Sequence, residues 1–162
     1  MLIVLANTGC QQSTIDFIVE GLPGDTLKYE MNFSCLKVMP DSLEGKERIL
    51  NSRLPFYYGY TTGYKSEDGD YLDCFLISPR NIMRGQKTEG YVKGVILMRD
   101  KNEEDSKLLL SETNLIIESQ IDSIVNYLLT YSTDEIVIDQ ITTNAVDYFA
   151  LIDRYRNERL KN

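Results

Sequence analysis

The sequence predicts an α+β fold, in which β-strands come first and α-helices follow. In roughly the first hundred residues, apolar residues fall in short stretches separated by glycine, proline and aspartate, a pattern typical of strands and turns. Further along the chain, apolar residues recur every three or four positions, as they do on one face of a helix. Strands followed by helices indicate an α+β layout.

The expected strands are short, and turn-forming residues separate most of them. They cover residues 15–20, 26–31, 35–39, 54–60, 71–77, 90–98, 108–110 and 136–141, and residues 3–6 form either a further short strand or part of a loose tail. The second of these strands alternates, since Leu27, Tyr29 and Met31 share one face. Lys28 and Glu30 share the opposite, polar face. The segment after the third strand, which contains proline, aspartate and glycine, is expected to be turn and loop.

In two later strands, the alternation of residues predicts which side chains share a face. Between residues 71 and 77, Leu72, Cys74 and Leu76 lie on one face and Asp73 projects to the other. Between residues 90 and 98, strict alternation puts four residues on one face: Val92, Gly94, Ile96 and Met98.

Two helices are expected in the last third of the chain. The first covers 118–131, where apolar residues recur at helical spacing: Ile117, Ile121, Ile124, Val125 and Leu128. The second covers 144–160, with Asn144 as its N-cap. Four basic residues lie near its C-terminal end, where the helix macrodipole favours cations: Arg154, Arg156, Arg159 and Lys161.

Composition limits the possible functions. The chain has 162 residues, which is most simply one domain over residues 1–162, with 1–14 as a short extra strand or a loose tail. The formal net charge of −8 argues against a nucleic-acid partner, because such partners require a basic surface. The chain contains no histidine, which excludes Ser-His-Asp triads, Cys-His dyads and histidine-ligated zinc. Any general base is therefore another side chain, such as a carboxylate.

The cysteines and the apolar stretches indicate a cytoplasmic protein. The three cysteines, Cys10, Cys35 and Cys74, form an odd set without a CxxC pair, which favours free thiols in a reducing compartment. No apolar run is long enough to span a membrane, so no membrane association is expected.

The chain carries one dense group of carboxylates after an aromatic strand. Asp68, Asp70 and Asp73 fall within six residues, just after Tyr58-Gly59-Tyr60. Such carboxylates repel one another unless cations neutralise them, and hard divalent cations prefer carboxylate oxygens. The spacing does not match a calcium-binding EF-hand loop. An acidic turn that closes a hairpin is the alternative interpretation.

Two further groups could join the first. The segment from Asp100 to Lys107 is acidic and follows a strand, although a solvated charged loop would look the same. Lys28 and Glu30 share a strand face, as an ordinary surface pair also would. Together, carboxylates for magnesium and lysines with tyrosines for phosphate oxygens suit phosphoryl transfer to water.

At these positions the chain resembles the soluble inorganic pyrophosphatases of family I. The matching segments are Lys28-Tyr29-Glu30, Pro55 with Tyr58-Gly59-Tyr60, Asp68-Gly69-Asp70-x-x-Asp73, Val92-x-Gly94-Val95-x-x-Met98-x-Asp100, and Glu104-Asp105-x-Lys107-Leu108. The spacing from Tyr58 to Lys107 is similar to that of the prokaryotic members without a gap, and the fainter resemblance covers about residues 17–161.

The resemblance implies a five-stranded OB-like β-barrel with the two C-terminal helices packed outside it. It implies Mg²⁺-dependent hydrolysis of inorganic diphosphate to two orthophosphates by a metal-activated water, with Asp70 as general base, in a homo-oligomer. The implied metal ligands are Asp68, Asp73 and Asp105 directly, Asp100 for metals that arrive with substrate, and Glu20 and Glu30 through water. The implied phosphate contacts are Lys28, Tyr58, Lys107, Tyr131 and either Lys46 or Arg48.

The chain departs from the family pattern at the phosphate-binding positions. The family has an arginine upstream of Tyr-Gly-Tyr, and the ungapped count reaches Lys46, with Arg48 close by. Lysine is a point charge and cannot offer the bidentate fork of arginine. Ser132 stands where a lysine is expected, Tyr57 where asparagine is usual, and Tyr71 where proline is usual. These changes keep two alternatives open: hydrolysis of another phosphoanhydride, such as a nucleotide or polyphosphate, and a non-catalytic phosphate- or metal-binding relative.

Overall fold

The computed structural model of the protein describes residues 14–130, 135–145 and 147–161. The elements are β1 (Thr14–Gly21), β2 (Tyr29–Asn32), β3 (Lys37–Pro40), β4 (Ser42–Leu43), β5 (Lys46–Glu47), β6 (Tyr57–Lys65), β7 (Tyr71–Ile77), β8 (Lys87–Asp100), β9 (Glu103–Glu104), β10 (Lys107–Ser111), α1 (Glu118–Thr130), β11 (Ile136–Thr142) and α2 (Tyr148–Arg159). Strands precede helices apart from β11, so the α+β layout is confirmed. The strand expected at 3–6 lies outside the described residues.

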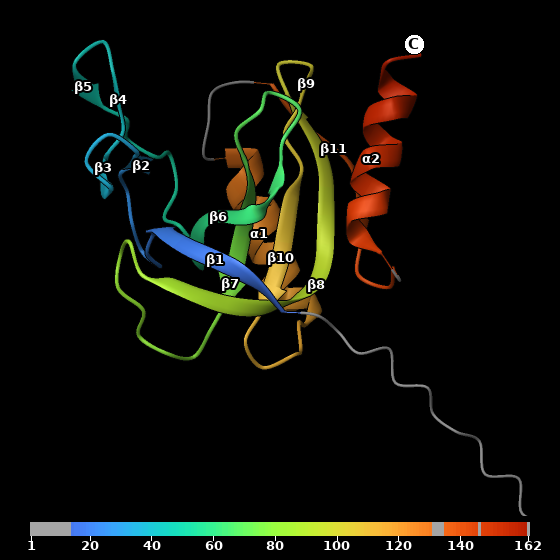
Figure 1. The fold of residues 1–162 in the computed structure, drawn as a ribbon, viewed down its shortest axis with the longest axis horizontal. Coiled ribbons are helices and arrows are strands. Elements are labelled where there is room, and N and C mark those ends of the chain that lie inside the picture. The colour runs from blue at the N-terminus through green and yellow to red at the C-terminus, as the bar shows by residue number, and fades with distance from the viewer. Residues whose placement is uncertain (1–13, 131–134, 146, 162) are drawn as a thin grey trace, which may run out of the picture.

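Five of the described strands close into a barrel. Their order is β1, β6, β7, β10 and β8, and β8 pairs back with β1 to complete the ring. Neighbours in the ring are antiparallel except β7 and β10, which run parallel. The predicted five-stranded OB-like barrel is therefore confirmed. β9 and β11 extend the barrel along β8, and the two helices lie outside it (Figure 1).

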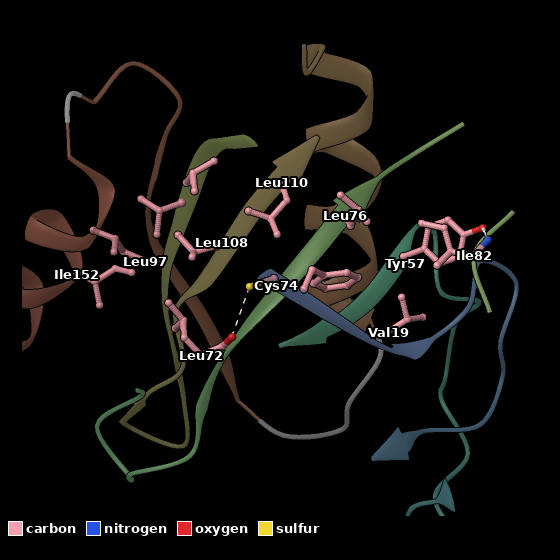
Figure 2. Packing of buried hydrophobic residues seen from close by; sticks show 13 residues of the cluster. Val19, Tyr57, Leu72, Cys74, Leu76, Ile82, Leu97, Leu108, Leu110 and Ile152 are labelled. Carbon is pink, nitrogen blue, oxygen red and sulfur yellow. Dashed lines mark hydrogen bonds between the residues drawn. The ribbon is translucent and has the colours of Figure 1, made fainter. Parts of the chain in front are cut away.

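The inward face of β7 agrees with the predicted alternation. Leu72, Cys74 and Leu76 are fully buried in one apolar cluster, and Cys74 lies near its centre (Figure 2). The neighbouring Phe75 points outward and joins a second cluster beneath α1. Burial of Cys74 raises the pKa of its thiol well above the ordinary value. Burying each such apolar side chain contributes roughly 1.5–3 kcal/mol to stability.

A β-bulge corrects the expected face of β8. Leu109 of β10 is opposite Gly94, but Leu110 is opposite Val92, so β8 contains one extra residue at this point. Val92 consequently packs in the barrel cluster, whereas Ile96 packs in the cluster under α1. The prediction that Val92 shares a face with Ile96 was wrong, because a bulge shifts the alternation by one residue.

Helix α1 covers the outer face of the barrel. Its buried residues Ile124, Tyr127 and Leu128 pack against four barrel side chains: Phe75, Ile96, Met98 and Leu109. The predicted bounds of 118–131 agree with the observed helix up to Thr130, and residue 131 lies outside the described residues. Within the described residues, neither helix is long and apolar enough to cross a membrane.

The N-cap of helix α2 lies three residues after the predicted cap. Asp147, not Asn144, is the N-cap, and its carboxylate accepts hydrogen bonds from the backbone N–H groups of Phe149 and Ala150 at 3.0 and 3.1 Å. Aspartate competes well for this role because its charge also complements the positive end of the helix dipole. Ile152 is the buried residue that attaches α2 to the barrel cluster.

Two small hairpins form an arm beside the barrel, here called the hairpin arm (residues 27–50). β2 pairs with β3, and β4 pairs with β5, so the segment predicted as turn and loop contains a short hairpin. The strand predicted at 26–31 begins later, at Tyr29, and Leu27 forms only an isolated bridge to Ile49. The arm projects from the barrel near one end of β1 and β6 (Figure 1). It therefore supplies one wall of any site at that end.

Replacing Gly59 of β6 by alanine is expected to destabilise the barrel strongly. A Cβ there would lie 1.8 Å from the Ile18 carbonyl oxygen of β1, and backbone cannot move aside as a flexible side chain would. We expect Gly59→Ala to reduce the free energy of unfolding by about 3 kcal/mol, measured by urea denaturation. Gly63→Ala, in the same strand, is the control, because its Cβ would be 3.7 Å from the Thr61 side chain. Equal unfolding midpoints for the two variants would contradict this account.

Candidate active site

A cavity of about 410 Å³ lies between the barrel, the hairpin arm, α1 and the loops around β9. Eight of the predicted site residues line it: Lys28, Arg48, Tyr58, Asp68, Asp73, Asp100, Asp105 and Lys107. A second cavity of about 430 Å³ is lined by Glu20, Glu30, Asp70 and again Asp73. Asp73 therefore stands in the wall between the two cavities. The fold brings the separate acidic groups of the sequence to one region.

Asp73 and Lys107 connect the two acidic groups directly. One oxygen of Asp73, Oδ2, accepts hydrogen bonds from the Tyr58 hydroxyl at 2.5 Å and from Lys107 Nζ at 2.6 Å. Lys107 Nζ also donates to Asp105 Oδ1 at 2.5 Å. The lysine side chain is only 3% exposed, whereas those of Asp73 and Asp105 are 31% and 30% exposed. Burial of the ammonium group strengthens these charge-assisted bonds. The ammonium group thus lies between a carboxylate from each acidic segment.

The register of the barrel explains why these side chains meet. Tyr58 of β6 is opposite Phe75 of β7, two pairs away from the pair of Tyr60 with Asp73. β7 lies next to β10, which begins at Lys107, and this places the lysine beside the strand that carries Asp73. Adjacent strands lie about 4.8 Å apart, within reach of a lysine side chain.

The electrostatics around Asp105 suit a hard cation. Burial raises the pKa of Asp105; Lys107 opposes this effect, while Asp73 and Asp100 add to it. Asp100 Oδ1 is buried and has no hydrogen-bond partner among the described residues. A divalent cation would offset both the repulsion and the unsatisfied oxygen, so the donor set fits such an ion.

The carboxylates that line the first cavity are close to one another, but they are not arranged as a complete set of metal ligands. Within residues 14–130, 135–145 and 147–161, no three acidic or cysteine side chains surround one point at which they could hold a metal ion. Instead, the two carboxylates that contact Lys107 are directed toward its ammonium group.

Glu20 joins the barrel to the hairpin arm. It is 7% exposed at the end of β1, and its Oε1 accepts the backbone N–H of Met31 at 2.6 Å. Burial raises the pKa of Glu20 to about 8, and the charges of Asp73 and Glu30 contribute to the rise. Glu20 is therefore placed as a buried acid at the edge of the second cavity.

The arm presents two cations to the first cavity. Lys28 bonds to Glu30, and Arg48 Nη1 donates to Asp41 Oδ2 at 3.0 Å. Lys46 lies in the exposed β4–β5 hairpin and does not line either cavity described here. Of the two positions that the sequence left open, Arg48 is thus the one at the cavity wall. Tyr131, the remaining predicted phosphate contact, and Ser132 lie outside the described residues.

The turn that carries Asp68 and Asp70 is built by its own side chains. Asp68 Oδ1 accepts the backbone N–H of Asp70 at 3.0 Å, and Gly69 has φ of +92°, which favours glycine. Asp70 is exposed and faces the second cavity, whereas Asp68 lines the first. The turn thus distributes neighbouring carboxylates between the two cavities.

Sequence reasoning missed an aromatic group in the second cavity. Tyr60 and Tyr71 stack with ring centroids 5.2 Å apart, and Phe33 of the hairpin arm lies about 6 Å from both rings. Tyr71 stands where the family usually has proline, and this substitution was the available signal. Phe33 could not be found from the sequence, because only the folded arm brings it to β6 and β7.

Comparison with known proteins shows which family the chain belongs to. The family model described as inorganic pyrophosphatase matches residues 17–156. The chain belongs to the inorganic pyrophosphatase family. The family that the sequence resembles is therefore confirmed.

Among relatives, the inorganic pyrophosphatase of Mycoplasma pneumoniae is 28% identical over 130 residues, covering 72% of this chain and 67% of that protein. That of Campylobacter jejuni is 28% identical over 137 residues, covering 83% and 71%. That of Sulfolobus acidocaldarius is 31% identical, and the match spans little more than half of its length, 53%.

Solved structures show the same fold. The inorganic pyrophosphatase of Thermus thermophilus superposes with a TM-score of 0.71 at 19% identity, covering 99% of this chain and 97% of that one. That of Helicobacter pylori also has a TM-score of 0.71, at 16% identity, with 97% and 99% coverage.

The stability of the protein is expected to fall as pH rises from 5 to 8. Between its ordinary pKa of 4.5 and its folded value of about 8, Glu20 holds a proton in the folded chain but not in the unfolded one. Folding then takes up a proton, so each pH unit costs up to about 1.4 kcal/mol. Urea unfolding without divalent cations should show a flatter pH dependence for Glu20→Gln. Glu47→Gln, at an exposed hairpin position, should behave as wild type. Parallel curves for wild type and Glu20→Gln would refute this interpretation.

Proposed function

We propose that the protein hydrolyses inorganic diphosphate to two orthophosphates, with Mg²⁺ as its cofactor. The observation that carries this proposal is the convergence of both acidic segments on one cavity, where Lys107 contacts Asp73 and Asp105. Family membership supports the same reaction, because the relatives are inorganic pyrophosphatases. A cavity lined by carboxylates and cations suits a substrate that is itself an anion paired with metal ions.

Asp68, Asp73 and Asp105 would hold the metal, and Asp100 would join them when substrate brings further ions. All four line the first cavity, and the unsatisfied oxygen of Asp100 supports this role. Glu20 and Glu30 would act through water from the second cavity. Bound magnesium would acidify the attacking water and screen the charge of the phosphate oxygens.

Asp70 would accept the proton of the attacking water. It lies at an exposed turn and lines the second cavity together with Asp73. Its backbone N–H donates to Asp68 Oδ1, so the turn keeps the backbone of Asp70 next to a proposed metal ligand. A carboxylate is the natural base in a chain that contains no histidine.

The phosphate groups would bind cationic and hydroxyl groups around the first cavity. Lys28 and Arg48 approach from the hairpin arm, and Tyr58 and Lys107 approach from the barrel. Tyr131 is proposed from sequence alone. Arg48 can offer a planar, two-pronged donor, which a lysine at position 46 could not.

We also propose that the protein is a cytoplasmic homo-oligomer. The exposed apolar side chains of Leu129 on α1 and Ile141 on β11 support an oligomer, because burial against another copy would remove them from water. Cys35 and Cys74 are free thiols, which fits a reducing compartment. Sedimentation at the monomer mass would contradict the proposed homo-oligomer. Export of the native protein would contradict the proposed cytoplasmic location.

Replacing Asp70 by asparagine is expected to abolish most diphosphate hydrolysis. Loss of a general base lowers rates by about a hundredfold or more, and the amide keeps the shape of the side chain. Phosphate release from diphosphate, with and without Mg²⁺, measures the effect. Asp122→Asn, on the exposed face of α1, is the control and should match wild type.

Assays with a nucleoside triphosphate and with a polyphosphate in place of diphosphate show which substrate the protein hydrolyses. If wild type releases phosphate only from those, the proposed substrate is wrong.

Arg48 rather than Lys46 is expected to contribute to substrate affinity. Removing a charge-assisted contact to phosphate costs enough free energy to raise KM about tenfold in Arg48→Ala. Lys46→Ala, only two residues away but outside the cavity lining, should change KM by less than about twofold, as exposed charges usually contribute little. Steady-state kinetics at saturating Mg²⁺ compare the two variants. The reverse order of effects would assign the phosphate contact to Lys46.

A further inference from the structure

The C-terminal half of α2 contacts both acidic loops through one guanidinium group. Arg156 Nε donates to Glu104 Oε2 at 2.8 Å, and its Nη1 donates to the backbone carbonyl of Lys65 at 3.1 Å. Glu104 ends β9, in the connection between β8 and β10, and Lys65 ends β6. Figure 1 shows the C-terminal end of α2 at the same end of the molecule as β9 and the β6–β7 connection.

The ion pair is buried and fixes the chain around Asp105. The Glu104 side chain is 0% exposed and that of Arg156 is 15% exposed. The other oxygen of Glu104 accepts the backbone N–H of Ser106 at 2.9 Å. The carboxylate therefore ties together the residues on either side of Asp105, and Arg156 fixes that carboxylate in turn.

The second contact of Arg156 holds the other acidic loop. Lys65 lies three residues before Asp68, and its carbonyl is where β6 turns into the loop. Arg159, one turn further along α2, repeats the pattern from outside, since it contacts Glu67 and the backbone carbonyl of Asn102. Two successive cations of one helix thus each join the same pair of loops.

We propose that Arg156 is a positioning residue, which holds the two acidic loops at the separation needed for Asp68 and Asp105 to share one divalent cation. This inference rests on the proposed function, because it assumes that the two loops bind a cation together. Asp68, Asp100 and Asp105 repel one another across the cavity, and loops free to separate would do so. Arg156 opposes that separation before the cation binds. The loops therefore lose less conformational freedom on binding, and the cation binds more tightly.

Arginine is specifically suited to this role. Its guanidinium group is planar and offers several donors in fixed directions, so one side chain can bond Glu104 and Lys65 simultaneously. A lysine offers one compact charge on a flexible stem. Arg156→Lys should therefore retain the charge beside Glu104 but lose the fixed link between the loops.

The test uses the full chain and the double variant Glu104→Gln/Arg156→Met. The single variant Arg156→Met would leave a buried carboxylate without its cation and could unfold the protein. The double variant removes both charges, so the core stays neutral while the buried link that Arg156 forms between the loops is lost. Mg²⁺ binding is measured by calorimetry without diphosphate, together with the Mg²⁺ concentration that gives half-maximal hydrolysis and the thermal unfolding midpoint.

We expect the double variant to bind Mg²⁺ about tenfold more weakly, since residues that orient metal ligands typically affect affinity to this extent. Raising the Mg²⁺ concentration should restore most of kcat, because the residues that contact substrate are unchanged. Arg156→Lys should also bind Mg²⁺ more weakly. Arg154→Met, on the exposed face of the same helix, is the matched control and should behave as wild type.

A double variant that binds Mg²⁺ as tightly as wild type would overturn the inference, even if its unfolding midpoint were lower, because Arg156 would then be purely structural. That result leaves the proposed function intact as long as wild type hydrolyses diphosphate. If wild type itself neither binds Mg²⁺ nor releases phosphate, the proposed function fails and this inference fails with it.

Discussion

Repulsion among carboxylates is the constraint on which the rest of this structure depends. Asp73, Asp100 and Asp105 are gathered in one cavity, and in surroundings of low dielectric such a group is unstable unless positive charge lies among it. Lys107 provides that charge from the start of β10, and it contacts two of the three. The raised pKa of Asp105 shows that the balance is incomplete, since burial and neighbouring carboxylates outweigh the lysine. A divalent cation is the natural completion of such a site.

The barrel is what makes this concentration of charge possible. Asp73 and Lys107 occupy neighbouring strands, and the backbone pairing of β7 with β10 holds them side by side. The apolar side chains on the inward face of β7 lie directly behind Asp73, so the strand that carries the carboxylate is anchored by its neighbours Leu72 and Cys74. The buried apolar cluster stabilises the fold, and this offsets the repulsion among the carboxylates at the cavity. A loop-based site with the same charges would have no such support.

Much of this arrangement could be predicted from the sequence, and the exceptions have physical causes. The alternation in β7 and the helical spacing of α1 are local patterns, and both were confirmed. The β8 bulge is set by pairing with β10, so no local pattern in β8 reveals it. The cap of α2 was predicted at the wrong residue because Asn144 and Asp147 are both good N-caps. Which of them caps the helix depends on where the backbone becomes helical, and here that is directly after Asp147. Whether Arg48 or Lys46 reaches the cavity depended likewise on the fold of the hairpin arm.

Arg156, near the C-terminal end of α2, contributes more through its ion pair with Glu104 than through the helix macrodipole. From sequence, Arg156 looked like a partner of the helix macrodipole, an effect worth roughly 0.3–1 kcal/mol and easily screened by salt. The structure pairs the same guanidinium with the fully buried carboxylate of Glu104. Leaving such a carboxylate without its partner costs roughly 3–5 kcal/mol, several times the dipole term. The position of Arg156 is therefore determined by the acidic loop that it contacts, and its effect on helix stability is secondary. Because the same group also bonds Lys65, the helix farthest along the chain is mechanically connected to both halves of the proposed metal site.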